Sequence, residues 1–157
     1  MFGRKYKVDA QVMTLETQRH DLENDLNAIK SNMGFIEFTP MGEILDANDL
    51  FLSVVGYRRE EIQGKHHRMF CEREYANSQE YLSFWENLRA GRTQRGTFKR
   101  VGKNGQAIWL EASYFPVIDG DHVVKIIKIA SDITAAKMTL LDRNALFSAL
   151  DKSLAVI

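Results

Sequence analysis

The stretch "KRVGKNGQAIWLEASYFPVID", residues 99–119, decides the fold together with "VVKIIKIASDIT", residues 123–134. Both are rich in β-branched and aromatic residues, and a further strand-like run, "RGTF", precedes the first. The connections "KNG" and "DGD" contain Asn-Gly and Asp-Gly pairs, which are strong signals for hairpin turns. The sequence therefore predicts an antiparallel meander of three strands.

The preceding segment adds two short strands and several helices. "GFIEFTPMGEILDAN", residues 34–48, alternates in polarity around a Pro-Met-Gly turn. Asp46 or Asn48 can cap the apolar helix that follows, and Gly56 can end it. "SQEYLSFWENLRAG", residues 78–91, places its apolar residues on one helical face. We expect an α+β fold: a five-stranded antiparallel sheet with short helices on one face, a long N-terminal helix and a C-terminal linker helix.

The N-terminal segment, residues 1–32, is predicted to be one long helix because residues 7–33 contain neither Gly nor Pro. Its apolar residues recur at alternating steps of three and four, and Arg19 fills the single polar position of this seam. The seam comprises Val8, Val12, Leu15, Leu22, Leu26, Ile29 and Met33. Such a narrow seam is typical of a coiled coil and predicts a homodimer. A helix lying along the surface of its own domain is the alternative.

Composition excludes several classes of protein. The 157 residues contain 21 Lys and Arg and 21 Asp and Glu, so no net charge attracts nucleic acid or an anionic membrane. Basic pairs such as Arg58-Arg59 and Lys99-Arg100 are therefore expected to be solvated. No uncharged run approaches the roughly 20 apolar residues that span a bilayer, and no signal peptide is recognisable. Cys71 is the only cysteine, which fits a reducing compartment, so we expect a cytoplasmic protein.

The C-terminal segment, residues 135–157, repeats the start of the domain. "SALDKSLAVI", residues 148–157, aligns without gaps with "NAIKSNMGFI", residues 27–36. A domain-sized offset predicts a linker helix that leads into a second copy of the domain. On this interpretation the sequence is a piece of a longer protein.

Residues 33–134 resemble a PAS sensor domain. The first half is carried by "GEILDANDLFLSVVGYRREEIQGK", residues 42–65, and the second by the two stretches quoted first, which end in Asp-Ile-Thr. "GKHHRMFCEREY" and "YLSFWENLRAG" are similar to the PAS domains of soluble, tandem-PAS methyl-accepting chemotaxis receptors of the aerotaxis type. The resemblance implies a sensor that is not an enzyme. It implies sensing of redox state or oxygen through FAD or haem, and a downstream signalling domain that controls a histidine kinase.

The run "HHRMFC", residues 66–71, allows three interpretations. A zinc site requires three or four ligands, and the run offers His66, His67 and Cys71 with no second cluster elsewhere, so we expect no metal. A Cys-His nucleophile requires thiolate activation and an orienting third group, and only the nearby Arg68 and Arg73 could lower the pKa of Cys71, so the sequence gives this interpretation little support. The third interpretation, the wall of a cofactor pocket, is favoured.

The resemblance assigns the pocket residues. "HHRMF" aligns with "NCRFL" of light-sensing flavin PAS domains, so His67 replaces the adduct-forming cysteine and Arg68 meets the flavin side chain. Trp85 provides a stacking surface, and His66 and Asn48 complete the predicted FAD site. Haem ligated by His66 or His67 is the alternative, and a ligand-free docking module is the third possibility. At the end of the sheet, Asp132 and Thr134 are predicted to cap the departing helix and to act as the hinge of signal relay.

Overall fold

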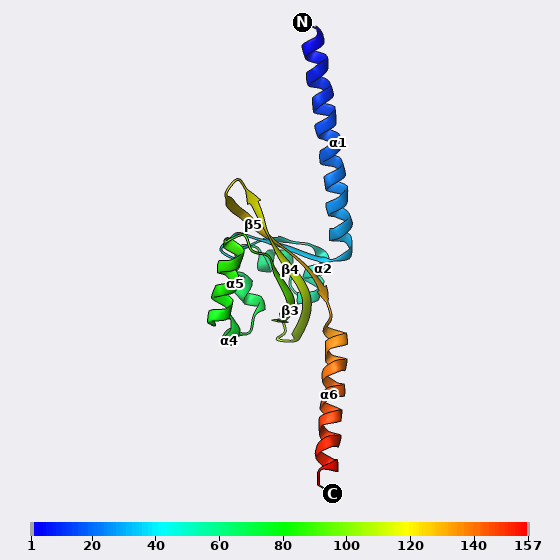
Figure 1. The fold of residues 1–157 in the computed structure, drawn as a ribbon, viewed down its shortest axis with the longest axis vertical. Coiled ribbons are helices and arrows are strands. Elements are labelled where there is room, and N and C mark those ends of the chain that lie inside the picture. Colours follow the sequence, from blue (N-terminus) through cyan, green and yellow to red (C-terminus); the bar gives the residue numbers. More distant parts are fainter. Residues whose placement is uncertain (1, 157) are drawn as a thin grey trace. The chain divides into compact units, whose positions relative to one another are not determined.

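The computed structural model describes residues 2–156, which fall into two units. The first unit is the helix α1 (Phe2–Asn32), drawn in blue in Figure 1, and none of its described residues is buried. Between 39% and 69% of the surface of its seam residues from Val8 to Ile29 is exposed. The predicted long N-terminal helix is confirmed, and its apolar seam has no partner within its own unit.

The second unit contains a five-stranded antiparallel sheet with the strand order β2-β1-β5-β4-β3 (Figure 1). The strands are β1 (Gly34–Phe38), β2 (Ile44–Ala47), β3 (Gln94–Val101), β4 (Ala107–Asp119) and β5 (His122–Asp132). The predicted hairpin turns contain Gly105 and Gly120, whose φ angles of +78° and +59° favour glycine. The α+β prediction, including all five strands, is confirmed.

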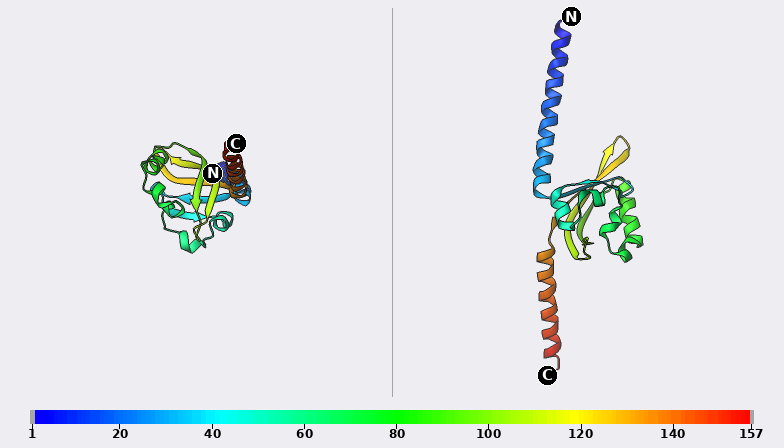
Figure 2. Two further views of the ribbon diagram at one scale, coloured as in Figure 1. Left: turned by 90° about the horizontal axis from the view of Figure 1, so that it is seen from below. Right: turned by 180° about the vertical axis from the view of Figure 1, so that it is seen from behind.

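Short helices cover one face of this sheet, as Figure 2 shows. They are α2 (Asp49–Val55), α3 (Arg59–Ile62), the 3₁₀ turn η1 (His67–Phe70), α4 (Arg73–Ala76) and α5 (Gln79–Arg89). Asn48 caps α2 by accepting a hydrogen bond from the Phe51 amide at 3.0 Å, and Gly56 ends it with a φ of +77°. Of the two residues predicted to cap α2, Asn48 therefore does so.

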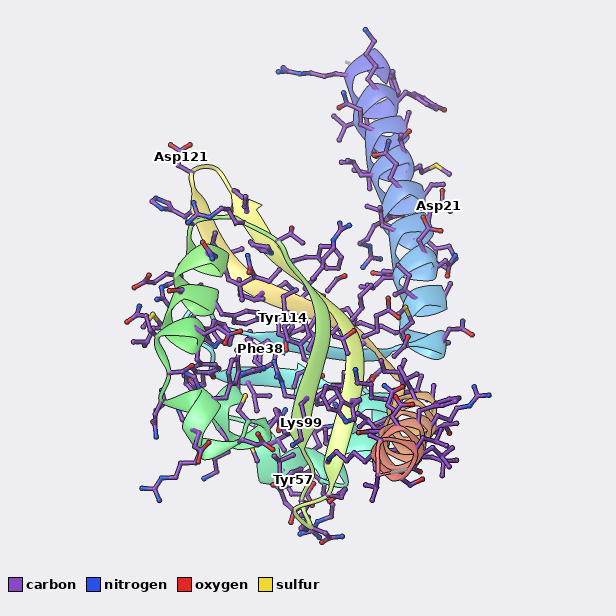
Figure 3. All side chains as sticks on the ribbon, turned by 60° about the horizontal axis from the view of Figure 1, so that its bottom comes forward. Asp21, Phe38, Tyr57, Lys99, Tyr114 and Asp121 are labelled. Carbon is purple, nitrogen blue, oxygen red and sulfur yellow. The ribbon has the colours of Figure 1, made fainter. Side chains whose placement is uncertain are left out.

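The core lies between the helices and the inner face of the sheet. Phe38 and Tyr114, both completely buried, lie next to each other there with ring centroids 6.5 Å apart (Figure 3). The same layer also buries three basic side chains, His67, Arg100 and Lys128, each at most 2% exposed. Charged groups are rarely buried without a partner, so these three residues identify the part of the core that requires explanation.

After β5 the chain continues into α6 (Thr134–Leu154), so the predicted C-terminal helix is confirmed. None of its residues is buried. Residues 155–156 form a turn, and Ile157, where the second copy of the domain was predicted to continue, lies outside the described residues. Within residues 2–156 no helix is long and apolar enough to cross a membrane.

Candidate functional site

The site is built around His67, which η1 directs into the core. His66 precedes η1 and caps it, because its Nδ1 accepts a hydrogen bond from the Arg68 amide at 3.1 Å. This local turn leaves His66 partly exposed and buries His67 completely. The two adjacent histidines therefore occupy different environments.

The His67 ring is held between two phenols. Its Nδ1 lies 3.0 Å from the hydroxyl of Tyr81 on α5, and its Nε2 lies 3.0 Å from the hydroxyl of Tyr114 on β4. Burial, followed by the charges of Arg100 and Lys128, holds the pKa of His67 well below its ordinary value. The imidazole is therefore neutral at physiological pH, with one nitrogen donating and the other accepting.

Aromatic rings surround this histidine. The nearest centroids are those of Phe38 at 5.3 Å and Trp85 at 5.4 Å, and the Phe84 ring is stacked on it at 6.3 Å. Trp85 is 4% exposed, and its indole N–H has no acceptor among the described residues. Trp85 and His67, which the sequence assigned to one pocket, lie side by side in the interior. The sequence did not foresee that Tyr81 and Tyr114 would bind the histidine.

Arg100 and Lys128 are the residues that sequence reasoning missed. The pair Lys99-Arg100 was expected to be solvated, but this expectation is wrong for Arg100, which is 2% exposed and lies at an inward-facing position of β3. Its Nη2 donates to the Tyr114 hydroxyl at 3.2 Å. Lys128 lies two residues from each of the buried residues Ile126 and Ala130 along β5, so its side chain points to the same inner face of the sheet. Strict reading of this two-residue period would have found the buried lysine.

The other predicted pocket residues have different roles in the described structure. Arg68 is exposed, and its Nε donates to His66 Nδ1 at 3.3 Å rather than entering the interior. Asn48 Oδ1 accepts from the amides of Phe35 and Phe51 at 2.9 and 3.0 Å, so it joins β1 to α2. His66 packs against Trp85 with ring centroids 6.0 Å apart. Of the predicted set, His67 and Trp85 line the interior, and His66 borders it.

Neither histidine offers a free ring nitrogen for haem. Both nitrogens of His67 are bound by phenols. His66 uses Nδ1 for the Arg68 amide and Nε2 for the Met41 carbonyl at 2.8 Å. An axial ligand needs an imidazole nitrogen with a free lone pair, so the residues as packed do not fit haem. Within residues 2–156, no group of three or more His, Cys, Asp or Glu side chains is arranged to hold a metal ion.

A flavin ring also does not fit the interior as it is packed. The ring centroids of Phe38, Phe84, Trp85 and Tyr114 lie between 5.3 and 6.3 Å from that of His67, and those of Phe84 and Tyr114 are only 4.8 Å apart. A bound isoalloxazine would have to separate these rings. FAD therefore stays a prediction of the sequence. Cys71 lies 3.8 Å from His67 Nδ1, and burial raises the pKa of its thiol, which disfavours a nucleophilic thiolate.

The predicted hinge residues connect the sheet to α6. Asp132 Oδ1 accepts from the Thr134 amide at 2.9 Å and so binds the first turn of the helix. Thr134 itself does not cap α6, because it is the first residue of that helix. Its hydroxyl instead accepts a hydrogen bond from the Trp109 amide on β4 at 3.0 Å. The Lys137 ammonium lies 4.7 Å from the centroid of the Trp109 ring. The first turn of α6 is thus attached to β4.

This fold, with its interior lined from the sheet and α5, defines the class of protein. The PAS domain family matches residues 32–135, and the chain belongs to that family. Biofilm dispersion protein BdlA of Pseudomonas aeruginosa is 44% identical over 131 residues, which are 83% of this chain and 31% of that protein. The aerotaxis receptor of Escherichia coli is 32% identical over 75 residues, which are 48% of this chain and 15% of the receptor. The chain therefore spans less than a third of the length of these relatives.

Solved structures share the fold at low sequence identity. The Rhodobacter sphaeroides LOV protein has a TM-score of 0.60 at 19% identity, and the match covers 71% of this chain and 66% of that one. An RNA-binding light-oxygen-voltage receptor has a TM-score of 0.65 at 20% identity, covering 81% of this chain and 37% of that one. At this level of identity the similarity establishes the PAS fold alone.

Proposed function

We propose that this chain is the cytoplasmic sensory PAS domain of a chemotaxis-type receptor, in which a change at the His67 cluster is relayed to α6. The observation that carries this proposal is the double role of β4. Tyr114 on its inner face binds His67, and Trp109 on its outer face binds Thr134 of α6. One strand therefore contacts both the interior and the outgoing helix.

The relay follows from the geometry of that strand. A change in the hydrogen bonding of the Tyr114 hydroxyl shifts β4 relative to the helices that cover it. Because the Trp109 amide donates to Thr134 and the Trp109 carbonyl accepts from Ile133 at 2.9 Å, the shift reaches the first turn of α6. The helix then has two arrangements, and the interior state selects between them.

The relatives support the receptor context. BdlA and the aerotaxis receptor contain regions similar to this chain, and both extend far beyond it. We infer that the domain acts within a longer receptor whose downstream signalling domain controls a histidine kinase. The α1 seam pairs two copies of the chain into a homodimer. In this role the domain is a sensor and not an enzyme.

Hydrogen exchange tests the relay directly. Tyr114→Phe removes one hydroxyl from the His67 cluster, so exchange of the Trp109 amide and of the first turn of α6 should accelerate about fivefold, the equivalent of one hydrogen bond. Tyr75→Phe is the matched control, since its hydroxyl makes no hydrogen bond within the described residues. Unchanged exchange at residues 109 and 134–137 in the Tyr114 variant would refute the relay.

Flavin sensing is the second candidate function. It is favoured by the unpaired indole N–H of Trp85, which lies beside both histidines and offers a donor to a polar ring edge. One distant structural relative, at 18% identity, is described as a light-oxygen-voltage domain studied with a flavin analogue. If the interior opens to take FAD, Trp85 and His67 would hold the ring, and the flavin would supply redox chemistry.

A visible absorption spectrum of the purified chain distinguishes the candidates. Flavin bands support the FAD proposal, and a Soret band supports the haem alternative. A colourless protein that stays colourless after incubation with FAD or haem would exclude both. The relay from His67 to α6 would then serve another ligand or a ligand-free docking module.

A further inference from the structure

Arg100 is a buried charge without a counter-ion. Arginine remains protonated in proteins, and Arg100 is 2% exposed. Within the part of the chain that the structure describes, no carboxylate lies within ion-pair distance of it. Its neighbour Lys99 instead pairs with Glu72 at 2.6 Å. An uncompensated charge of this kind is strongly unfavourable in a protein core.

The interior around this arginine has more hydrogen-bond donors than acceptors. Arg100 Nη1 and Nη2 reach the Lys99 carbonyl and the Tyr114 hydroxyl at 2.8 and 3.2 Å, but Nε has no acceptor. The Lys128 amine, 1% exposed, faces the rings of Phe51 and Tyr114 at 5.3 and 4.9 Å, and burial, followed by the charge of Arg100, holds its pKa well below the ordinary value of a lysine. It has no carboxylate within ion-pair distance among residues 2–156. Among the described residues, Arg100 Nε is therefore a buried donor that lacks an acceptor.

A cavity leads to Arg100 from the surface. Its volume is about 220 Å³, and its lining comprises Glu72, Tyr75, Glu80, Thr97, Phe98, Lys99 and Arg100. The Arg100 guanidinium lies 4.9 Å from the centroid of the Phe98 ring and 5.6 Å from that of Tyr75. The cavity is smaller than the roughly 300–1,000 Å³ of sites for drug-sized ligands. A ligand of this cavity is therefore small, and it meets a lining that includes one buried guanidinium and two aromatic rings.

We propose that this cavity binds a small organic carboxylate whose anionic group pairs with Arg100 and whose apolar part lies between Tyr75 and Phe98. A carboxylate is an acceptor with two oxygens, and the guanidinium presents donors in a matching planar geometry. Arg100 Nη2 donates to the Tyr114 hydroxyl at 3.2 Å and the Lys128 nitrogen lies 4.9 Å from the centroid of the Tyr114 ring, so both side chains lie next to Tyr114. An apolar body distinguishes this ligand from inorganic phosphate, because it can also contact the two aromatic rings that line the cavity.

The ligand would give the sensory domain an input, and only this consequence rests on the proposed function. Arg100 donates to Tyr114, which binds His67 and belongs to the strand that contacts α6. A carboxylate that draws Arg100 toward the cavity changes the hydrogen bonding of Tyr114. If a carboxylate binds and α6 does not change, the site is retained and the relay is refuted. If Tyr114→Phe alters α6 but no carboxylate binds, the relay is retained and the site is refuted.

Titration of the purified chain tests the site. Sodium benzoate and sodium propionate are added at constant ionic strength against sodium chloride, with sodium phosphate as the inorganic comparison, and binding is followed by calorimetry and by Tm. We expect saturable binding of at least one carboxylate and a rise in Tm of about 5 °C or more at ten times its Kd. Saturation by phosphate alone would overturn the carboxylate assignment, and no response beyond that to chloride would overturn the site.

Two substitutions locate the binding. Arg100→Met should weaken carboxylate binding about tenfold to a hundredfold and should leave the unliganded Tm unchanged or higher, because it removes an unpaired buried charge. A merely structural arginine would instead lower that Tm. Lys103→Met is the matched control, since it removes an exposed charge that is paired with Glu61 at 2.6 Å and lies outside the lining of the cavity. It should change the affinity by less than about threefold.

A third variant tests the direction of entry. Glu80 lies on the lining of the cavity and places a negative charge in the path of an anion. Glu80→Gln should tighten carboxylate binding about twofold to threefold, and weaker binding would contradict entry by this route. If Arg100→Met does not fold, the wild-type titration and the Glu80→Gln variant still test the proposal. Absence of carboxylate binding by the wild type overturns it without any variant.

Discussion

The helix α1 and the interior of the PAS domain depart from ordinary burial in opposite directions. In α1 the apolar seam is exposed, and Leu22 reaches 69%. In the domain interior, the basic residues His67, Arg100 and Lys128 are at most 2% exposed. An exposed apolar seam and a buried guanidinium that has no counter-ion among the described residues, that of Arg100, both carry a free-energy cost that a partner can remove. We therefore expect the helix to bind a protein partner and the interior to bind a small ligand.

The largest expected effect concerns the exposed seam of α1. Leu22→Lys combined with Leu26→Lys places charges on the seam, so a homodimer formed through α1 should become monomeric, with the PAS domain still folded. Light scattering gives the mass, and circular dichroism the fold. Thr17→Lys combined with Asn24→Lys is the matched control, because these positions lie opposite the seam. Persistent dimers in the seam variant would show that the seam does not mediate dimerisation.

The next effect concerns the two histidines. His67→Ala leaves the hydroxyls of Tyr81 and Tyr114 without their shared partner and opens a cavity, so the free energy of unfolding should fall by about 2–4 kcal/mol. His66→Ala removes hydrogen bonds at a partly exposed site and should cost about 1 kcal/mol. Urea unfolding measures both. Equal losses would indicate that the interior cluster contributes nothing beyond an ordinary turn.

The smallest effect is a dependence on pH. Because burial, and then the charges of Arg100 and Lys128, lower the pKa of His67 in the folded state, the unfolded chain takes up this proton first as the pH falls below about 6.5. The contribution of neutral His67 to stability is complete above that pH and is lost below it, by at most about 1.4 kcal/mol per pH unit. Burial lowers the pKa of His66 as well, so that residue acts in the same direction.

Chemical unfolding at pH 7.5 and 5.5 measures this loss. His67→Gln removes the titrating group from the interior, while its amide still donates and accepts. The difference in pH dependence between wild type and variant isolates His67 from the carboxylates that also titrate toward acid pH. A variant with the pH dependence of the wild type would show that His67 is not responsible.

Local signals determined most of the fold. Asn-Gly and Asp-Gly turns, the alternation of the strands and the seam of α1 are properties of neighbouring residues. The predicted strands and both long helices are present within residues 2–154. His67 and Trp85 were placed in one interior because both belong to motifs of a PAS domain. The assignment of these two residues to one pocket therefore required no three-dimensional distances.

The tertiary structure alone decided what the interior contains. Lys99 and Arg100 are adjacent and chemically alike, but strand pleating directs Arg100 inward and leaves Lys99 exposed to pair with Glu72. Tyr81 and Tyr114, 33 residues apart, meet on opposite sides of one imidazole. Such contacts depend on which strands and helices lie next to one another. Local propensities leave that arrangement open, because it is set by the packing of elements that are distant in the sequence.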